Sequence, residues 1–211
     1  MTSRKSTATG SELRARLVRE ATEILAHSGF AGLTVRRVAD AAGCSTIGIY
    51  THFTDKNGLI EAVLLDAFAD FEVALRDVDA VPAGRAQLVA GAHTYRDWAL
   101  TNRSRYMVMF TSYAPHFEVS AEASARMAMS LSGHNRRIAA AIETGDLAMV
   151  DDVETTAYHL WACIHGHVML DFFFRRDAAD EDARRAFDRA HDLILESLSP
   201  ARRRGTGRTR G

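Results

Sequence analysis

Apolar side chains recur every three or four residues along most of the 211-residue chain, which is the period of an α-helix with one buried face. No run alternates between apolar and polar residues in the manner of a β-strand. The pattern predicts a first helix that begins at Ser11 and stops at Gly29. Its apolar face consists of Leu13, Leu17, Ala21, Ile24 and Leu25. Later helices are expected near residues 84–102, 104–113, 120–144, 153–175 and 181–198, and the predicted fold is therefore all-α, with about nine helices.

Two short helices and a longer one are predicted between these regions. Thr34 is placed to cap a second helix that ends at Gly43, and Ser45 is placed to cap a third, with the sequence STIGIYTH. Thr54 would cap a fourth helix that reaches about Val78. Two short capped helices joined by a glycine-containing turn form the layout of a helix-turn-helix, whose second helix enters the major groove of DNA. The same spacing also fits a plain three-helix core with a polar connector.

The predicted third helix is rich in small polar residues, which are middling or poor helix formers. Ser45 and Thr46, at its start, can donate hydrogen bonds to phosphates or bases, and the free backbone N–H groups there favour an anion. Ile49 and Phe53 are expected to anchor the segment to the core, so that it needs little helix propensity of its own. This combination favours a DNA-contacting role.

The chain divides into four regions by composition. We expect a flexible N-terminal arm over residues 1–10 and a helix-turn-helix domain over 11–60. A larger helical domain follows over 61–199, and Pro82 breaks the chain inside it. Residues 200–211 are rich in glycine and arginine with nothing to pack, and they are predicted to be a disordered basic tail.

Charge is distributed unevenly between these regions, although the net charge is only −1. Residues 1–60 carry eight Lys or Arg against five Asp or Glu, whereas residues 61–200 carry thirteen against twenty-two. Contact with a polyanion is therefore expected from the first sixty residues. The two cysteines offer no disulfide framework, and no apolar run is long enough to span a membrane. Because the N-terminus also lacks a secretory signal, the expected location is the cytoplasm, with no membrane partner.

The segment LTVRRVADAAGCSTIGIYTHFTDKNGLIEAV (Leu33–Val63) closely resembles the DNA-binding domain of the tetracycline-repressor (TetR) family of transcriptional regulators. The resemblance implies that these residues bind double-stranded operator DNA: Thr34, Arg36, Ser45, Thr46, Gly48, Tyr50, Thr51, His52 and Lys56. Lys56 would hold a phosphate. Two features depart from the family pattern, because Ile47 and Gly48 offer little hydrogen bonding and KNGL replaces the commoner acidic run after the lysine.

The rest of a TetR-family chain forms a helical domain for ligand binding and dimerisation. Here WACIHG (Trp161–Gly166) resembles a Trp–His–Gly signature of one subgroup. The family pattern implies that the helices near 153–175 and 181–198 pair with their copies as a four-helix homodimer interface. An apolar face on the first of these helices fits such an interface and fits an ordinary core equally well; it consists of Leu160, Ile164, Val168 and Phe172.

A cluster of methionines and aromatic residues in the middle helices suits an adaptable pocket for a small, mainly apolar effector. Such residues at helical spacing are just as often simple core. The residues expected to bind the effector are Trp98, Met107, Phe110, Tyr113, Met127, His134, Trp161 and His165.

Other kinds of protein fit less of the sequence. His159, Cys163 and His167 share a helix face and could ligate a metal in a metal-sensing regulator. A helical protein-interaction module that does not bind DNA is a further alternative. No enzyme activity or cofactor is expected, because no glutamate has a histidine three positions on and no phosphate-binding glycine loop or G-x-S-x-G elbow occurs. The sequence thus predicts a ligand-responsive repressor that binds a pseudo-palindromic operator as a homodimer.

Overall fold

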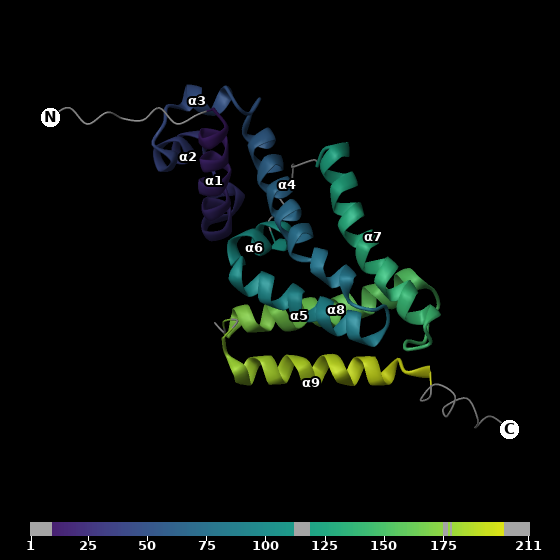
Figure 1. The fold of residues 1–211 in the computed structure, drawn as a ribbon. Coiled ribbons are helices and arrows are strands. Elements are labelled where there is room, and N and C mark those ends of the chain that lie inside the picture. The colour runs from purple at the N-terminus through teal and green to yellow at the C-terminus, as the bar shows by residue number, and fades with distance from the viewer. Residues whose placement is uncertain (1–9, 112–118, 175–176, 178, 201–211) are drawn as a thin grey trace. The chain divides into compact units, whose positions relative to one another are not determined.

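The computed structural model describes residues 10–111, 119–174, 177 and 179–200. These residues form nine α-helices, one 3-10 helix and no β-strand, which confirms the all-α prediction (Figure 1). The elements are α1 (Gly10–Gly32), α2 (Val35–Ala42), α3 (Thr46–Tyr50), α4 (Lys56–Ala74), η1 (Arg76–Ala80), α5 (Arg85–Thr101), α6 (Arg103–Thr111), α7 (Ala121–Glu143), α8 (Val153–Phe173) and α9 (Glu181–Ser197).

Two compact units share these helices. The first contains the described residues of 1–69 and 103–126, so it includes α1, α2, α3, most of α4, all of α6 and the start of α7. The second contains the described residues of 70–102 and 127–211. The sequence predicts a domain boundary near residue 60, which divides the chain into consecutive segments. Such a boundary cannot reveal that α6 belongs to the same unit as α1, α2 and α3.

The core of the first unit is formed by the apolar faces that the helical spacing predicts. Ile49 of α3 and Phe53 are buried in it, as expected, and they join the short helix to α1 and α2. Val108 of α6 belongs to the same core. The largest fully buried apolar side chains in this unit include Leu17, Leu25, Leu33, Ile49, Leu59 and Ile60.

The helix ends in this unit follow local capping chemistry. The Thr34 hydroxyl accepts a hydrogen bond from Arg37 N, and Gly43 ends α2 in the left-handed conformation (φ 65°, ψ 38°). The predicted cap at Thr54 was wrong by one residue, because Asp55 Oδ1 accepts the Gly58 N–H at 2.8 Å. A carboxylate is the better partner there, since it also complements the positive end of the helix dipole.

Other predicted ends also shift, except at Gly29. Gly29 leaves the helical conformation (φ 60°, ψ −171°), so the regular part of α1 stops there as predicted, and a short helical stretch follows to Gly32. Ser11 lies within the helix, which starts at Gly10. The fourth helix ends at Ala74 rather than near Val78, and a 3-10 turn follows it. The physical reason is that the Gln87 side-chain amide donates to the carbonyl oxygens of Val78 and Val81, which fixes this segment outside α4.

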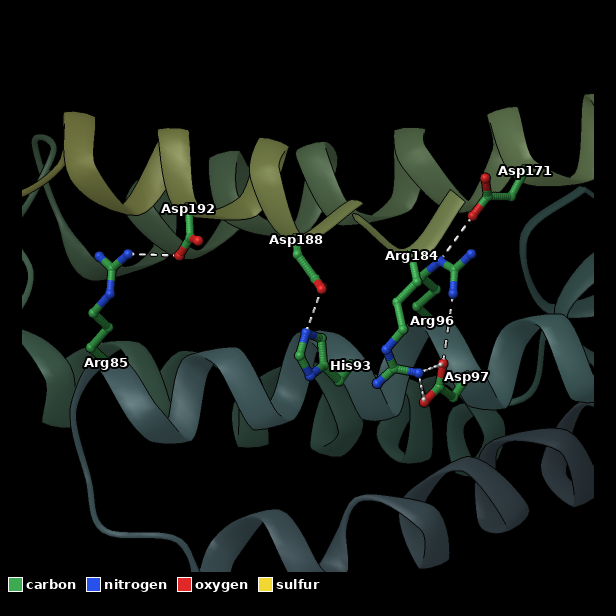
Figure 2. Close-up of polar contacts among 8 residues, drawn as sticks. All are labelled: Arg85, His93, Arg96, Asp97, Asp171, Arg184, Asp188 and Asp192. Atoms are coloured by element: carbon green, nitrogen blue, oxygen red, sulfur yellow. Dashed lines mark hydrogen bonds and ion pairs between the residues drawn. The ribbon is translucent and has the colours of Figure 1, made fainter. Parts of the chain in front are cut away.

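In the second unit, α8 lies beside α9 and packs on α5 (Figure 1). The apolar face on α8 that the sequence left open between core and interface is core, because Leu160, Ile164, Val168 and Phe172 are all buried within the single chain. Polar pairs join α9 to α5 (Figure 2), namely Arg85–Asp192 at 2.8 Å, His93–Asp188 at 2.7 Å and Arg184–Asp97 at 3.2 Å.

Within the described part of the chain, no helix has both the length and the hydrophobicity that crossing a membrane requires.

Candidate DNA-binding surface and effector residues

The α3 helix turns one face to the core and the other to solvent. Ile49 is fully buried, whereas Thr46, Ile47, Tyr50 and Thr51 are exposed. These four positions fall on one arc of a helix with 3.6 residues per turn. The arc is therefore available to a partner that approaches α3 from outside.

Two hydrogen bonds within residues 45–51 stabilise α3 and involve the hydroxyl groups of Ser45 and Thr51. Ser45 Oγ accepts from Gly48 N at 3.4 Å, and Thr51 Oγ1 donates to the Ile47 carbonyl at 3.0 Å. Gly48 is half-buried, and a Cβ there would make ordinary contact with Cys44 Sγ at 3.6 Å. The free protein thus has room for an alanine at this position, and no packing contact among the described residues requires a glycine there.

The other predicted DNA contacts lie on the elements that flank α3. Arg36 on α2 is exposed, and its Nε lies 4.0 Å from Asp40 Oδ2. Lys56, at the start of α4, is half-buried, and its Nζ donates to the Phe30 carbonyl at 3.0 Å. One ammonium hydrogen therefore ties α4 to α1, and two remain for another acceptor.

All nine residues predicted to bind DNA lie in the first unit, and none of them is buried. Two further side chains support this surface but were missed from the sequence. The guanidinium of Arg14 lies over the Phe53 ring, 5.3 Å from its centroid, and Arg37 Nη1 donates to Ser28 Oγ at 3.1 Å. The cluster of Arg14, Arg16 and Arg19 on α1 is the signal in the sequence that could have pointed to Arg14.

Three of the predicted effector residues gather in the second unit around Tyr95, which the sequence reasoning missed. The Trp161 Nε1–H donates to the Tyr95 hydroxyl at 3.1 Å, and that hydroxyl lies 3.2 Å from His165 Nδ1. Burial lowers the pKa of His165, which favours the neutral ring. Tyr95 can then donate to Nδ1 while it accepts from Trp161, and the proton of His165 is held on Nε2.

Phe71 links this group to the third predicted residue, Trp98. The Phe71 ring centroid is 5.5 Å from that of Tyr95 and 4.8 Å from that of Trp98. The Trp98 Nε1–H donates to Asp70 Oδ2 at 2.9 Å. The i, i+3 spacing of Tyr95 and Trp98 on α5 could have identified Tyr95, whereas Phe71 and Asp70 come from another helix and no spacing points to them.

The remaining predicted effector residues are more scattered. His134 on α7 lies 3.0 Å from the Ala157 carbonyl through Nε2, and burial lowers its pKa. Met127 is half-buried on the same helix. Met107 and Phe110 lie on α6 and belong to the first unit, and Tyr113 lies outside the described residues.

An exposed apolar strip follows the outer side of α8. Tyr158, Leu170 and Phe173 are exposed, and a Cβ on Gly166 would meet nothing within 4 Å. A shallow, solvent-open hollow lies between α8 and α9, and it is lined by Cys163, Ile164, His167, Phe187, Ala190 and His191. This side of the second unit offers a surface to a partner.

The metal alternative finds no support in the geometry. Among the residues that the structure describes, no group of three His, Cys, Asp or Glu side chains is placed to hold a metal ion. His159 and Cys163 point to solvent, and the His167 ring packs edge-on against Phe187 with centroids 5.6 Å apart.

Comparison with known proteins identifies both halves of the chain. Residues 17–63 match the model for bacterial regulatory proteins of the tetR family, and residues 88–194 match the model for a tetracyclin repressor-like C-terminal domain. The HTH-type transcriptional regulator Rv1816 of Mycobacterium tuberculosis is 25% identical over 190 residues, which cover 77% of this chain and 81% of that protein.

Solved structures share the fold. A Rhodococcus sp. RHA1 protein of unknown function superposes with a TM-score of 0.73 at 24% identity, over 94% of this chain and all of that one. The regulator FadR from Bacillus subtilis, in complex with stearoyl-CoA, superposes with a TM-score of 0.66 at 15% identity, over 88% of this chain and 97% of that one. The matched models cover the helix-turn-helix and most of the second unit, and the chain belongs to the TetR family of DNA-binding transcriptional regulators.

Proposed function

We propose that this regulator is a repressor that binds a pseudo-palindromic operator as a homodimer and is released by a small, mainly apolar effector. The observation that carries the proposal is the solvent-facing arc of α3, which lies within the segment that matches the family's DNA-binding model. In a helix-turn-helix, this second helix enters the major groove and the flanking elements contact the backbone. Arg36 and Lys56 are the cations in position for those phosphate contacts.

The proposed dimer uses the outer side of α8. Glycine inside a helix costs about 1 kcal/mol relative to alanine, and no contact with another described residue compensates for it at Gly166. A closely approaching helix of a second copy would compensate, and the neighbouring side chains Leu170 and Phe173 would lose their exposure to water. Two-fold symmetry then requires two half-sites about one helical turn of DNA apart. Because it acts on operator DNA, the regulator would work in the cytoplasm.

The effector is proposed to bind the second unit near Trp98, Trp161 and His165. Their surroundings are aromatic, and the polar groups among them are hydrogen-bonded to one another, which suits an apolar body that carries one polar end. The complex of FadR with stearoyl-CoA is a precedent for an acyl chain in this fold. Release of DNA then requires that the effector bind one conformation more tightly, and a coupling of about 1–3 kcal/mol is typical.

The test of DNA binding begins with the full-length protein and a library of random duplexes. We expect enrichment of a pseudo-palindrome that binds roughly 10³-fold or more tightly than a shuffled duplex in fluorescence anisotropy. Tyr50→Ala should lose much of this preference. Failure to enrich any sequence would contradict the proposal and would favour a helical protein-interaction module.

The test of the effector is a thermal-shift screen of apolar metabolites, repeated with Trp161→Ala, which removes one ring of the aromatic group around Tyr95. A true effector should raise the melting temperature and weaken binding to the enriched duplex, and the substitution should abolish both effects while DNA affinity stays within a few-fold. A screen in which no stabilising compound weakens DNA binding would contradict the effector half of the proposal and leave the DNA-binding half standing.

A further inference from the structure

An isoleucine occupies the centre of the exposed arc of α3. The Ile47 side chain is 76% exposed, and Tyr50 is the only other large apolar residue of the first unit that is exposed in the described part of the chain. An exposed isoleucine gains nothing from the fold, because its methyl groups face water. Its position therefore points to contact with a partner.

The order of side chains around α3 places Ile47 on the side that would face a DNA groove. At 100° per residue, Thr46, Tyr50, Ile47 and Thr51 follow one another around the exposed arc, and Ile49 lies on the opposite side. Tyr50 and Ile47 occupy the middle of the arc, and the two threonines lie at its edges. A duplex that approaches α3 along this arc meets the isoleucine and the tyrosine first.

Two polar side chains next to Ile47 already form hydrogen bonds within the chain, so an apolar contact to DNA is left for Ile47. The Ser45 hydroxyl caps α3, and the Thr51 hydroxyl donates its hydrogen to the Ile47 carbonyl. Ile47 itself cannot form hydrogen bonds through its side chain. Of the features that base edges present in the major groove, only the 5-methyl group of thymine is apolar.

We infer that Ile47 reads a thymine methyl group in each half-site of the operator. This inference rests on the proposed binding of operator DNA and specifies one chemical feature of that DNA. The contact is a van der Waals contact between the Ile47 side chain and the C5 methyl, and it discriminates thymine from the other three bases without a hydrogen bond.

The test replaces one thymine at a time by deoxyuridine in the enriched duplex. Deoxyuridine removes only the methyl group and leaves the hydrogen-bonding edge unchanged. We expect one symmetry-related thymine pair at which the wild-type protein loses roughly fourfold in affinity per methyl removed. Ile47→Ala should bind the thymine and deoxyuridine duplexes equally at this position, and Ile47→Val should retain part of the difference.

Thr46→Ala serves as the matched control on the same helix. It should weaken binding to both duplexes and leave the ratio between them unchanged. Because Ile47 is exposed, circular dichroism and the melting temperature of Ile47→Ala should match those of the wild type. A wild-type protein that binds the enriched duplex but is insensitive to every deoxyuridine would overturn the inference, as would a sensitivity that survives in Ile47→Ala. Absence of any enriched duplex would overturn the proposed function itself.

Discussion

Replacing Asp171 by asparagine removes the carboxylate that pairs with a buried guanidinium. Arg96 on α5 is 1% exposed, and its Nε donates to Asp171 Oδ2 on α8 at 2.9 Å (Figure 2). The Asp171 side chain is 3% exposed. Among the described residues, Arg96 Nη1 and Nη2 have no hydrogen-bond partner, and a second carboxylate, that of Asp97, lies 3.8 Å from Nη1 and is 41% exposed. Asp171 therefore supplies most of the charge compensation.

The expected loss follows from leaving that charge uncompensated. Breaking one side of a buried ion pair costs about 3–5 kcal/mol, a large share of a typical total stability of about 5–15 kcal/mol. With a denaturant slope of about 2–3 kcal/mol per molar, the urea midpoint should fall by roughly 1–2 M. Asp97→Asn is the matched control, because its pair with Arg184 is solvent-exposed and should contribute no more than about 1 kcal/mol.

Urea unfolding followed by circular dichroism, at one fixed protein concentration, measures both variants. A third protein, with Arg96→Met and Asp171→Leu together, separates the charge from the packing. Its stability should return close to the wild-type value, because a buried pair can often be replaced by apolar side chains without loss. The reasoning is refuted if Asp171→Asn costs less than about 1 kcal/mol, or if the double variant is no more stable than the single one.

Four further outcomes follow from single contacts. Lys56→Met should lower the salt dependence of DNA binding by about one phosphate contact and cost about 1 kcal/mol of stability, because it also removes the bond to the Phe30 carbonyl; anisotropy across salt concentrations and urea unfolding measure the two effects. Thr34→Ala should lose about 1 kcal/mol in urea unfolding through the missing cap of α2, and an unchanged midpoint would show that this hydroxyl does not stabilise the helix. Burial lowers the pKa of His191 to about 4, so the unfolded chain takes up this proton first as the pH falls; stability that is fully present above about pH 6.5 should decline by about 3 kcal/mol towards pH 4, and His191→Phe should flatten that decline. Phe173→Glu, at a side chain that is 77% exposed, should leave the fold intact but convert the dimer to monomers in sedimentation and weaken DNA binding, and a variant that remains dimeric would exclude this face.

The helix-turn-helix could be predicted well from the sequence because its determinants are local. Thr34, Gly43 and Ser45 each act within four residues of their own position, so the chain order alone specifies α2 and the start of α3, whereas α3 ends at Tyr50 and not at the predicted His52. The Thr54 cap failed for the same local reason: two adjacent residues can both cap a helix, and only the geometry shows that Asp55 does so.

The second unit was less predictable because α8 is apolar on more than one side. Leu160 and Val168 face the chain's own core, whereas Leu170 and Phe173 face outward, and helical spacing alone does not say which face is which. Trp161 and His165 could be predicted as effector residues but Tyr95 could not, since Tyr95 lies about seventy positions away from them in the sequence. The resemblance of residues 161–166 to a Trp–His–Gly subgroup stays a prediction.

Hydroxyl-radical footprinting on the enriched duplex tests most directly that this protein recognises DNA as a two-fold dimer through α3. We expect two equivalent protected patches, centred about one helical turn apart and related by the symmetry of the sequence. Both patches should disappear together in Tyr50→Ala and in Phe173→Glu at concentrations that saturate the wild type. A single protected patch occupied by a monomer at full affinity, or a footprint unchanged in Tyr50→Ala, would contradict the account.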